Sequence, residues 1–293
     1  MNAINTAINA PVISIASSAY LSDLAISVWS ASKKDKSASE EVTQNKHAKR
    51  GVANVNKKLL QCDSLIAIQK FAANVRNAHY THTLPWADCG LRLLTQAKYQ
   101  EYDALMVKLQ AEFYNLVENF INDYTWEVQE AEAALGDLFN KEDYPAAHRL
   151  RDKFRFSVTY FPVADHSDFR VANGIEAAER YKHFYQRALN NAMHSVWERC
   201  AKALGNMSER LDYSDTDTKK IFRDSLVDNA LEIVDLMRDC NVTNDPVMEE
   251  TRARLERALR HVGADDLRKS APLRAAVKKS VDDVLASIPS LDM

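Results

Sequence analysis

Glycine is scarce in this chain, with only six residues among 293. Soluble proteins average about 7% glycine, so the chain holds less than half of the usual share. Tight turns and phosphate-cradling loops need backbone that carries no Cβ atom. The scarcity therefore predicts long helices with few turns between them, and it argues against a phosphate-binding loop of the chain's own.

Composition and charge are ordinary for a globular protein, with 46% hydrophobic residues, 27% charged residues and a net charge of −3. The four cysteines, Cys62, Cys89, Cys200 and Cys240, stand far apart, which is typical of reduced thiols rather than of disulfides or a zinc site. No apolar run approaches the roughly 18 residues of a membrane span, and the N-terminus lacks the basic flank of a signal peptide. We therefore expect a cytoplasmic protein that has no membrane partner.

Two apolar stripes with the period of an α-helix occupy residues 102–138 and 175–211. Each stripe takes ten steps over 36 residues, a mean spacing of 3.6 residues. Because the stripes have equal length, we expect them to pack on each other as a long antiparallel helical hairpin. Gly136 and Gly205 interrupt the stripes near their ends, where each would cap or kink its helix.

Three segments alternate like short strands, at residues 24–29, 80–84 and 154–161. The third is the clearest, because four apolar side chains alternate with polar ones from Phe154 to Tyr160. We expect these segments to form a small sheet of two or three strands. Between the first two, residues 30–49 are polar and predict a loop, and about 54–78 predicts a helix with basic ends.

The C-terminal third predicts further helices. One follows residues 215–217, one opens at Asp245-Pro246 and ends at Gly263, and one opens at Ser270 and stops at Pro289. The expected fold class is α+β and predominantly α-helical. The expected organisation is a loosely ordered N-terminus over 1–20, a mixed domain with sheet and long helices over 21–212, and a helical region over 213–293 packed on it.

Charge is segregated along the chain. Residues 33–58 carry eight Lys or Arg against three acids, and residues 252–279 carry nine against three, whereas 101–143 carry eleven acids against two lysines. One interpretation is that solvated faces simply differ in sign. The other is that the basic segments contact acidic regions, within or between subunits, or contact phosphate.

The basic residues of these two segments are the candidate contacts with nucleic acid or an acidic partner. They are Lys46, Lys49, Arg50, Lys57, Lys58, Arg257, Arg260, Arg268, Lys269, Lys278 and Lys279.

Catalytic and cofactor signatures were sought and none was found. His79 and His82, with Cys89 nearby, resemble zinc ligands, but on the expected strand two residues three apart point to opposite faces. The phosphate-loop, dinucleotide and nucleophile-elbow motifs are absent from the sequence. We therefore expect no metal, no cofactor and no enzymatic activity, although a triad assembled from distant residues would leave no such signature.

The sequence resembles a bacterial and bacteriophage family of unknown function. The likeness rests on Ile-Ser-Val-Trp at 26–29 with a basic pair ending at Lys34, on Leu-Pro-Trp at 84–86, and on Asn-Phe-Ile-Asn-Asp-Tyr at 119–124 followed by Trp126. It covers roughly residues 20–210, and the segment after Lys34 departs from it. The resemblance implies a phage or bacterial origin, and genes of this family often lie beside a MoxR-type AAA+ ATPase and a von Willebrand factor A-like protein.

These observations favour a non-enzymatic interaction or adaptor protein that works with an AAA+ ATPase and self-associates. The alternative is a nucleic-acid-binding protein that uses basic segments 46–58 and 252–279. A hydrolase with a dispersed site is a third hypothesis, for which the sequence names no residue.

Overall fold

A computed structural model describes residues 14–165, 175–212 and 225–289. Its strands are β1 (Ala19–Ser27), β2 (Ser32–Asp35), β3 (Val55–Lys58), β4 (Leu84–Pro85), β5 (Arg92–Thr95) and β6 (Arg155–Pro162). Its helices are α1 (Lys36–Asn45), α2 (Asp63–His82), α3 (Gln96–Leu135), α4 (Ala147–Leu150), α5 (Ile175–Leu211), α6 (Ser225–Cys240), α7 (Pro246–Leu259), α8 (Ala264–Lys269) and α9 (Ala271–Ser287). The fold is α+β and mostly helical, as expected.

The chain divides into two compact units. Unit 1 comprises Met1–Asp23, His82–Gln100 and Tyr160–Met293, and unit 2 comprises Leu24–Thr81 and Glu101–Thr159. This division differs from the boundary expected at residue 212, because the helices on both sides of that position belong to unit 1. The expected loose N-terminus also differs in part: residues 1–13 lie outside the described residues, but Ile15 is fully buried and β1 begins at Ala19.

The strands form one four-stranded sheet in the order β4-β5-β1-β6 and one two-stranded sheet of β2 and β3. β1 pairs antiparallel with β5, with Ala19 opposite Thr95, and β2 pairs antiparallel with β3, with Lys33 opposite Lys57. The sheet is larger than the two or three strands expected. The strands expected at 24–29 and 154–161 are present as β1 and β6.

The strand expected at 80–84 is wrong for most of its length. Helix α2 continues to His82, and only Leu84–Pro85 is extended. Val75 and His79 lie one helical turn apart on α2 and are both buried. The buried face of the helix therefore continues to the start of the 80–84 segment, whose alternating residues had suggested a strand.

Two neighbouring expectations also fail. Residues 30–49 are not a loop, because β2 and α1 occupy most of them, and the helix expected at 54–78 begins only at Asp63, after strand β3. Asp35 explains the start of α1: its carboxylate accepts a hydrogen bond of 3.0 Å from the Ala38 N–H, which is an N-cap.

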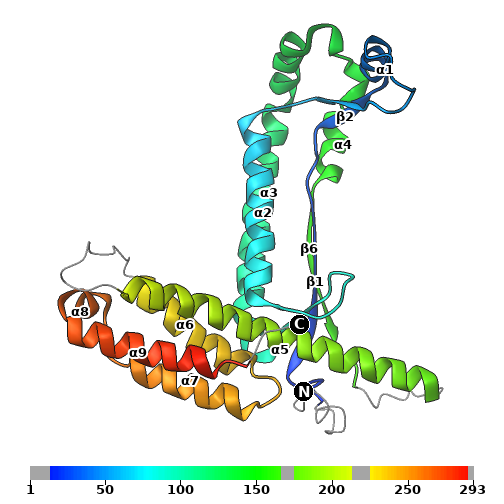
Figure 1. Cartoon of the computed structure of the whole chain (residues 1–293). Helices are drawn as coiled ribbons and strands as arrows, with labels where there is room; N and C mark the ends of the chain where they lie inside the picture. The colour runs from blue at the N-terminus through cyan, green and yellow to red at the C-terminus, as the bar shows by residue number, and fades with distance from the viewer. Residues whose placement is uncertain (1–13, 166–174, 213–224, 290–293) are drawn as a thin grey trace. The chain divides into compact units, whose positions relative to one another are not determined.

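Unit 2 is built on an antiparallel pair of helices, α2 and α3, which lie side by side in Figure 1. His79 near the end of α2 contacts Tyr102 near the start of α3, with 2.6 Å between the imidazole Nδ1 and the phenol oxygen. At the other end, the Cys62 thiol just before α2 lies close enough to Glu127 of α3 to influence the pKa of its carboxyl. The long helix over 102–138 therefore finds its hairpin partner in α2.

The apolar stripe of α3 packs against aromatic side chains of unit 2. Phe120 is fully buried, and its ring centroid lies 5.8 Å from that of Phe154, 6.0 Å from Tyr124 and 6.4 Å from Trp29. The Gln110 side chain donates a hydrogen bond of 2.9 Å to the Phe156 carbonyl. The helix ends at Leu135, and the next residue, Gly136, has a φ of +51°, a conformation that favours glycine.

Unit 1 contains the second long helix in a bundle with the C-terminal helices. Helix α5 packs on α6 and α9, and α7 packs on the same two helices (Figure 1). The two long helices were expected to pack on each other, and this expectation is wrong. Each helix buries its apolar stripe among elements of its own unit. Equal length and period are properties of each helix alone and do not specify its neighbour.

The C-terminal helices begin largely where the sequence indicated. Asp245 caps α7, with Pro246 at its first position, and Ser270 caps α9. Helix α7 ends at Leu259 rather than Gly263, which instead precedes α8. Gly205 lies inside α5, whereas the helix start expected after residues 215–217 lies outside the described residues.

Candidate functional site

A groove of about 1290 Å³ opens in unit 2 where β2 and the start of α1 face the end of α3 and the segment after it. We call it the unit 2 groove. It is lined by Lys33, Lys34, Asp35, Lys36, Ser37, Lys57, Tyr124, Thr125, Val128, Gln129, Glu132, Asp137, Leu138, Phe139, Asn140, Lys141, Asp143, Tyr144, Pro145, Ala146 and Ala147.

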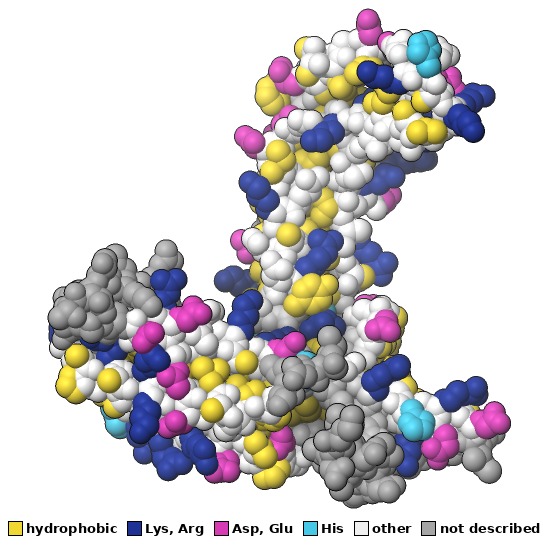
Figure 2. Space-filling view, in the orientation of Figure 1, with side chains coloured by type: hydrophobic (Ala, Val, Ile, Leu, Met, Phe, Trp, Pro, Cys, Tyr) yellow, Lys and Arg dark blue, Asp and Glu magenta, His cyan; other side chains and the backbone are white. Residues whose placement is uncertain are grey.

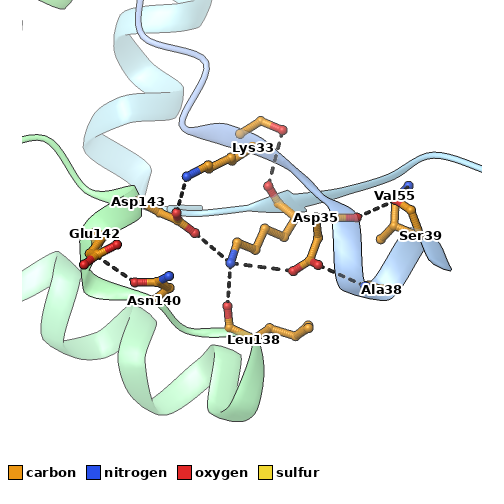
Figure 3. A network of polar contacts seen from close by, with 11 residues as sticks. Lys33, Asp35, Ala38, Ser39, Val55, Leu138, Asn140, Glu142 and Asp143 are labelled. Carbon is orange, nitrogen blue, oxygen red and sulfur yellow. Dashed lines mark hydrogen bonds and ion pairs between the residues drawn. The ribbon is translucent and has the colours of Figure 1, made fainter. Parts of the chain in front are cut away.

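An ion-pair network ties the β2–β3 hairpin to the segment after α3. Lys33 and Lys57 stand directly opposite each other on the two strands, a placement that is unfavourable for like charges. The Asp143 carboxylate resolves the conflict because it accepts a hydrogen bond from each ammonium, at 2.7 Å for Lys57 (Figure 3). Two of its members are enclosed, because the side chain of Lys57 is 9% exposed and that of Asp143 is 4% exposed, whereas that of Lys33 is 54% exposed.

Two further contacts complete the shell around the Lys57 ammonium. It donates to the Leu138 carbonyl at 2.8 Å, and its Nζ lies 3.6 Å from an Asp35 carboxylate oxygen. Asp35 thereby serves both the ion-pair network and the N-cap of α1. A single lysine at the edge of the groove therefore contacts three pieces of chain, which carry Asp35, Leu138 and Asp143.

The pKa values in this network move as the contacts require. Hydrogen bonds from Lys33 and Lys57 lower the pKa of the Asp143 carboxyl, and the hydrogen bond to Asp143 raises the pKa of Lys57. Both groups therefore remain charged at neutral pH.

The lowered pKa of Asp143 makes the stability of unit 2 depend on pH. A carboxyl whose folded pKa is depressed stabilises the fold above its unfolded pKa of about 3.9, and this contribution is lost as the pH falls through the folded value. As the pH drops below about 4, we expect the urea midpoint of unit 2 to fall by more in the wild type than in Asp143→Asn. Urea titrations across this range test it, with Asp137→Asn expected to keep the wild-type profile. Parallel profiles for the wild type and Asp143→Asn would contradict it.

Aromatic side chains form part of the groove lining, and their hydroxyls are already occupied. The Tyr124 hydroxyl donates to the Pro145 carbonyl and the Tyr144 hydroxyl to the Leu59 carbonyl, each at 2.9 Å. Burial raises the pKa of Tyr124 to about 12 and also raises that of Tyr144. Both phenols stay neutral. Tyr124 is only 4% exposed, so the ring surface available in the groove comes from Tyr144 and Phe139.

Exposed lysines surround α1 and the groove, and in the described parts of the chain they form no ion pair. We call this group the basic rim; its members are Lys34, Lys36, Lys46, Lys49 and Lys58. Figure 2 shows Lys and Arg side chains beside hydrophobic ones in the part of unit 2 that holds α1. Of the three acids in residues 33–58, Asp35 and Glu40 are already in ion pairs.

The first predicted basic segment is therefore divided by the structure. Lys46, Lys49 and Lys58 belong to the rim, but Arg50 pairs with Glu40 at 2.6 Å. Lys57, expected as a partner contact, is instead enclosed by its own chain. The sequence reasoning selected neither Lys34 nor Lys36, although the charge count included both.

The second predicted segment belongs to unit 1, so the two segments are separate candidates. Two of its candidate cations pair with neighbouring carboxylates, Arg268 with Asp265 at 2.7 Å and Lys278 with Asp282 at 2.8 Å, and Arg257 donates to the Ala253 carbonyl. Arg260, Lys269 and Lys279 are exposed. This segment presents less uncompensated charge than the rim.

The strand geometry that argued against a zinc site at His79 and His82 is not present in the structure. His79 and His82 lie on helix α2 rather than on a strand, and His79 is buried against Tyr102. Over residues 14–165, 175–212 and 225–289, no group of three metal-binding side chains is found. None of the helices within these ranges combines the length and apolar content of a membrane span.

Comparison with protein-family models, with curated proteins and with solved structures finds no match to this chain. The fold and the groove therefore define a mostly helical α+β protein with a candidate interaction surface in unit 2.

Proposed function

We propose that this protein is a non-enzymatic interaction protein that holds an acidic partner protein on the basic rim. The observation that carries the proposal is the uncompensated charge of the rim. Five exposed lysines there form no ion pair with any described residue, and Glu41 is the only acid in 33–58 that also forms none. A local patch of one sign steers and orients a partner of the opposite sign.

Apolar side chains among these lysines favour a protein as the partner. Val42 is 41% exposed and Val52 is 70% exposed, and both lie in the same stretch as Lys46 and Lys49. Protein interfaces combine apolar contacts with a polar rim. The MoxR-type AAA+ ATPase implied by the family resemblance is the first partner to test, in an adaptor role.

The test is binding of that ATPase to the full chain and to charge variants. Lys46→Gln/Lys49→Gln/Lys58→Gln is expected to weaken binding by about tenfold at low salt, which corresponds to about 1.4 kcal/mol. The matched control is Lys70→Gln/Lys108→Gln/Lys153→Gln, which removes the same charge from exposed positions of unit 2 outside the rim. Equal losses in the two variants, or no complex and no change in ATP hydrolysis, would refute the proposal.

A second candidate function is nucleic-acid binding by the same lysines, favoured by their lack of carboxylate partners. Binding of DNA or RNA would then weaken with salt by about 0.7–0.9 log units per phosphate contact per log unit of salt. A mobility-shift assay at low salt with single- and double-stranded DNA and RNA tests it, using the same two triple variants. No shift with any of these nucleic acids rules this candidate out.

A further inference from the structure

The unit 2 groove has dimensions that suit a segment of polymer. Small-molecule pockets usually enclose about 300–1,000 Å³, and this groove holds about 1290 Å³ in an open form. Its lining comes from β2, α1, α3 and the segment 136–147, and its aromatic hydroxyls are bound to backbone carbonyls. An extended chain would meet ring faces and charged side chains along the groove.

The charges that remain available in the groove are of both signs. Within the network, the charges of Lys33 and Lys57 are balanced by the two carboxylates of Asp143 and Asp35. This leaves exposed lysines and exposed acids that form no ion pair with any described residue: Lys34, Lys36, Lys141, Glu132 and Asp137.

These charges favour a peptide over a nucleic-acid strand as the occupant. A phosphate backbone is uniformly negative and would be repelled by Glu132 and Asp137. An acidic peptide places its carboxylates selectively near the lysines and turns other side chains toward the acids. Leu138 is 46% exposed and lies beside Phe139 in the lining, so the groove also offers an apolar contact.

We infer that the groove seats an extended acidic segment of the partner protein, with its carboxylates on Lys34, Lys36 and Lys141 and an apolar side chain on Leu138 and Phe139. The inference rests on the proposed function, because it assigns the groove and the rim to one acidic partner. The rim supplies orientation and the groove supplies specificity for a linear sequence.

The experiment uses the full chain and a labelled peptide in which Glu and Leu alternate, with binding followed by fluorescence anisotropy. Gln129→Trp fills the groove from an exposed position of α3 without changing its charge, and Asn122→Trp is the control on the same helix outside the lining. We expect Gln129→Trp to weaken peptide binding by about tenfold and Asn122→Trp to leave it unchanged. Lys34→Gln/Lys36→Gln/Lys141→Gln is expected to weaken it comparably, which covers the case in which the tryptophan disturbs folding.

The outcomes separate this inference from the function on which it rests. No peptide binding, or equal binding by wild type, Gln129→Trp and the groove triple, overturns the inference. If labelled oligothymidylate binds and is lost in Gln129→Trp while the peptide does not bind, the groove is a nucleic-acid site and the inference is wrong. If the peptide result holds but the rim triple binds the ATPase normally, the groove stands and the proposed docking on the rim fails.

Discussion

Replacing Phe120 by alanine is expected to destabilise unit 2 by about 3–5 kcal/mol. Phe120 is fully buried, and its ring contacts Tyr124 of the same helix and two rings from other parts of unit 2, Trp29 and Phe154. The loss combines the transfer free energy of the ring with the cavity left between α3, β6 and the residues after β1. Urea unfolding and amide hydrogen exchange on peptides from unit 2 measure the effect.

Trp126 provides the matched control on the same helix. Its side chain is larger than that of Phe120 but is 59% exposed, so Trp126→Ala is expected to change the free energy of unfolding by no more than about 0.5 kcal/mol. If the two substitutions lower the free energy of unfolding by the same amount, the apolar stripe of α3 is not buried as described.

Replacing Asp143 by asparagine is expected to cost about 1.5–3 kcal/mol, because the ammonium groups of Lys57 and Lys33 lose their charged hydrogen-bond acceptor. Lys57 would keep the Leu138 carbonyl and the longer contact to Asp35, but it would face Lys33 across the hairpin with no carboxylate between them. Hydrogen exchange should increase first in residues 32–58. The free energy of unfolding from urea titration gives the magnitude.

A second substitution tests the reason for that loss. Lys57→Met in the Asp143→Asn background removes the unpaired charge and is expected to restore part of the stability. Glu142→Gln, an exposed neighbour of Asp143, is the control and should change the free energy of unfolding by no more than about 0.5 kcal/mol. A double variant no more stable than Asp143→Asn would show that charge burial is not the cause.

Elements with a strong internal pattern were predictable. Helices α3 and α5 repeat their apolar residues at the helical period over many turns, and β6 alternates Phe156, Val158 and Tyr160 with polar residues. The caps at Asp245 and Ser270 were also predictable, because a capping side chain acts on its own first turn. In each case the interaction that fixes the element is local.

Helix α1 was missed because its buried side chains are polar. Ser39 and Thr43 are its buried residues, and they satisfy their hydroxyls locally: Ser39 bonds to the Asp35 carbonyl, and Thr43 bonds to the Ser39 carbonyl at 2.7 Å. Ser39 also accepts from the Val55 N–H at 2.9 Å, which ties α1 to β3. A helix whose buried residues are polar leaves no hydrophobic periodicity in the sequence, so this pattern could not predict it.

The candidate site was predictable only as a charge excess. A count over 33–58 found the basic segment, but it could not separate the enclosed Lys57 from exposed Lys46 and Lys49, because that difference depends on Asp143, more than eighty residues away. Lys141 was counted within an acidic region, and no sequence signal places it at the groove.

The sequence by itself determined that this chain is mostly helical, that its two longest helices bury one stripe each, and that its positive charge gathers in two segments. Period, capping and composition are local properties, and each acts within a few residues. Only the tertiary structure decided that α3 pairs with α2 and α5 with α6 and α9, and which lysines remain without a carboxylate. Those choices depend on contacts between residues far apart in the chain, where an apolar stripe accepts any complementary face and a lysine pairs with whichever acid the fold brings near.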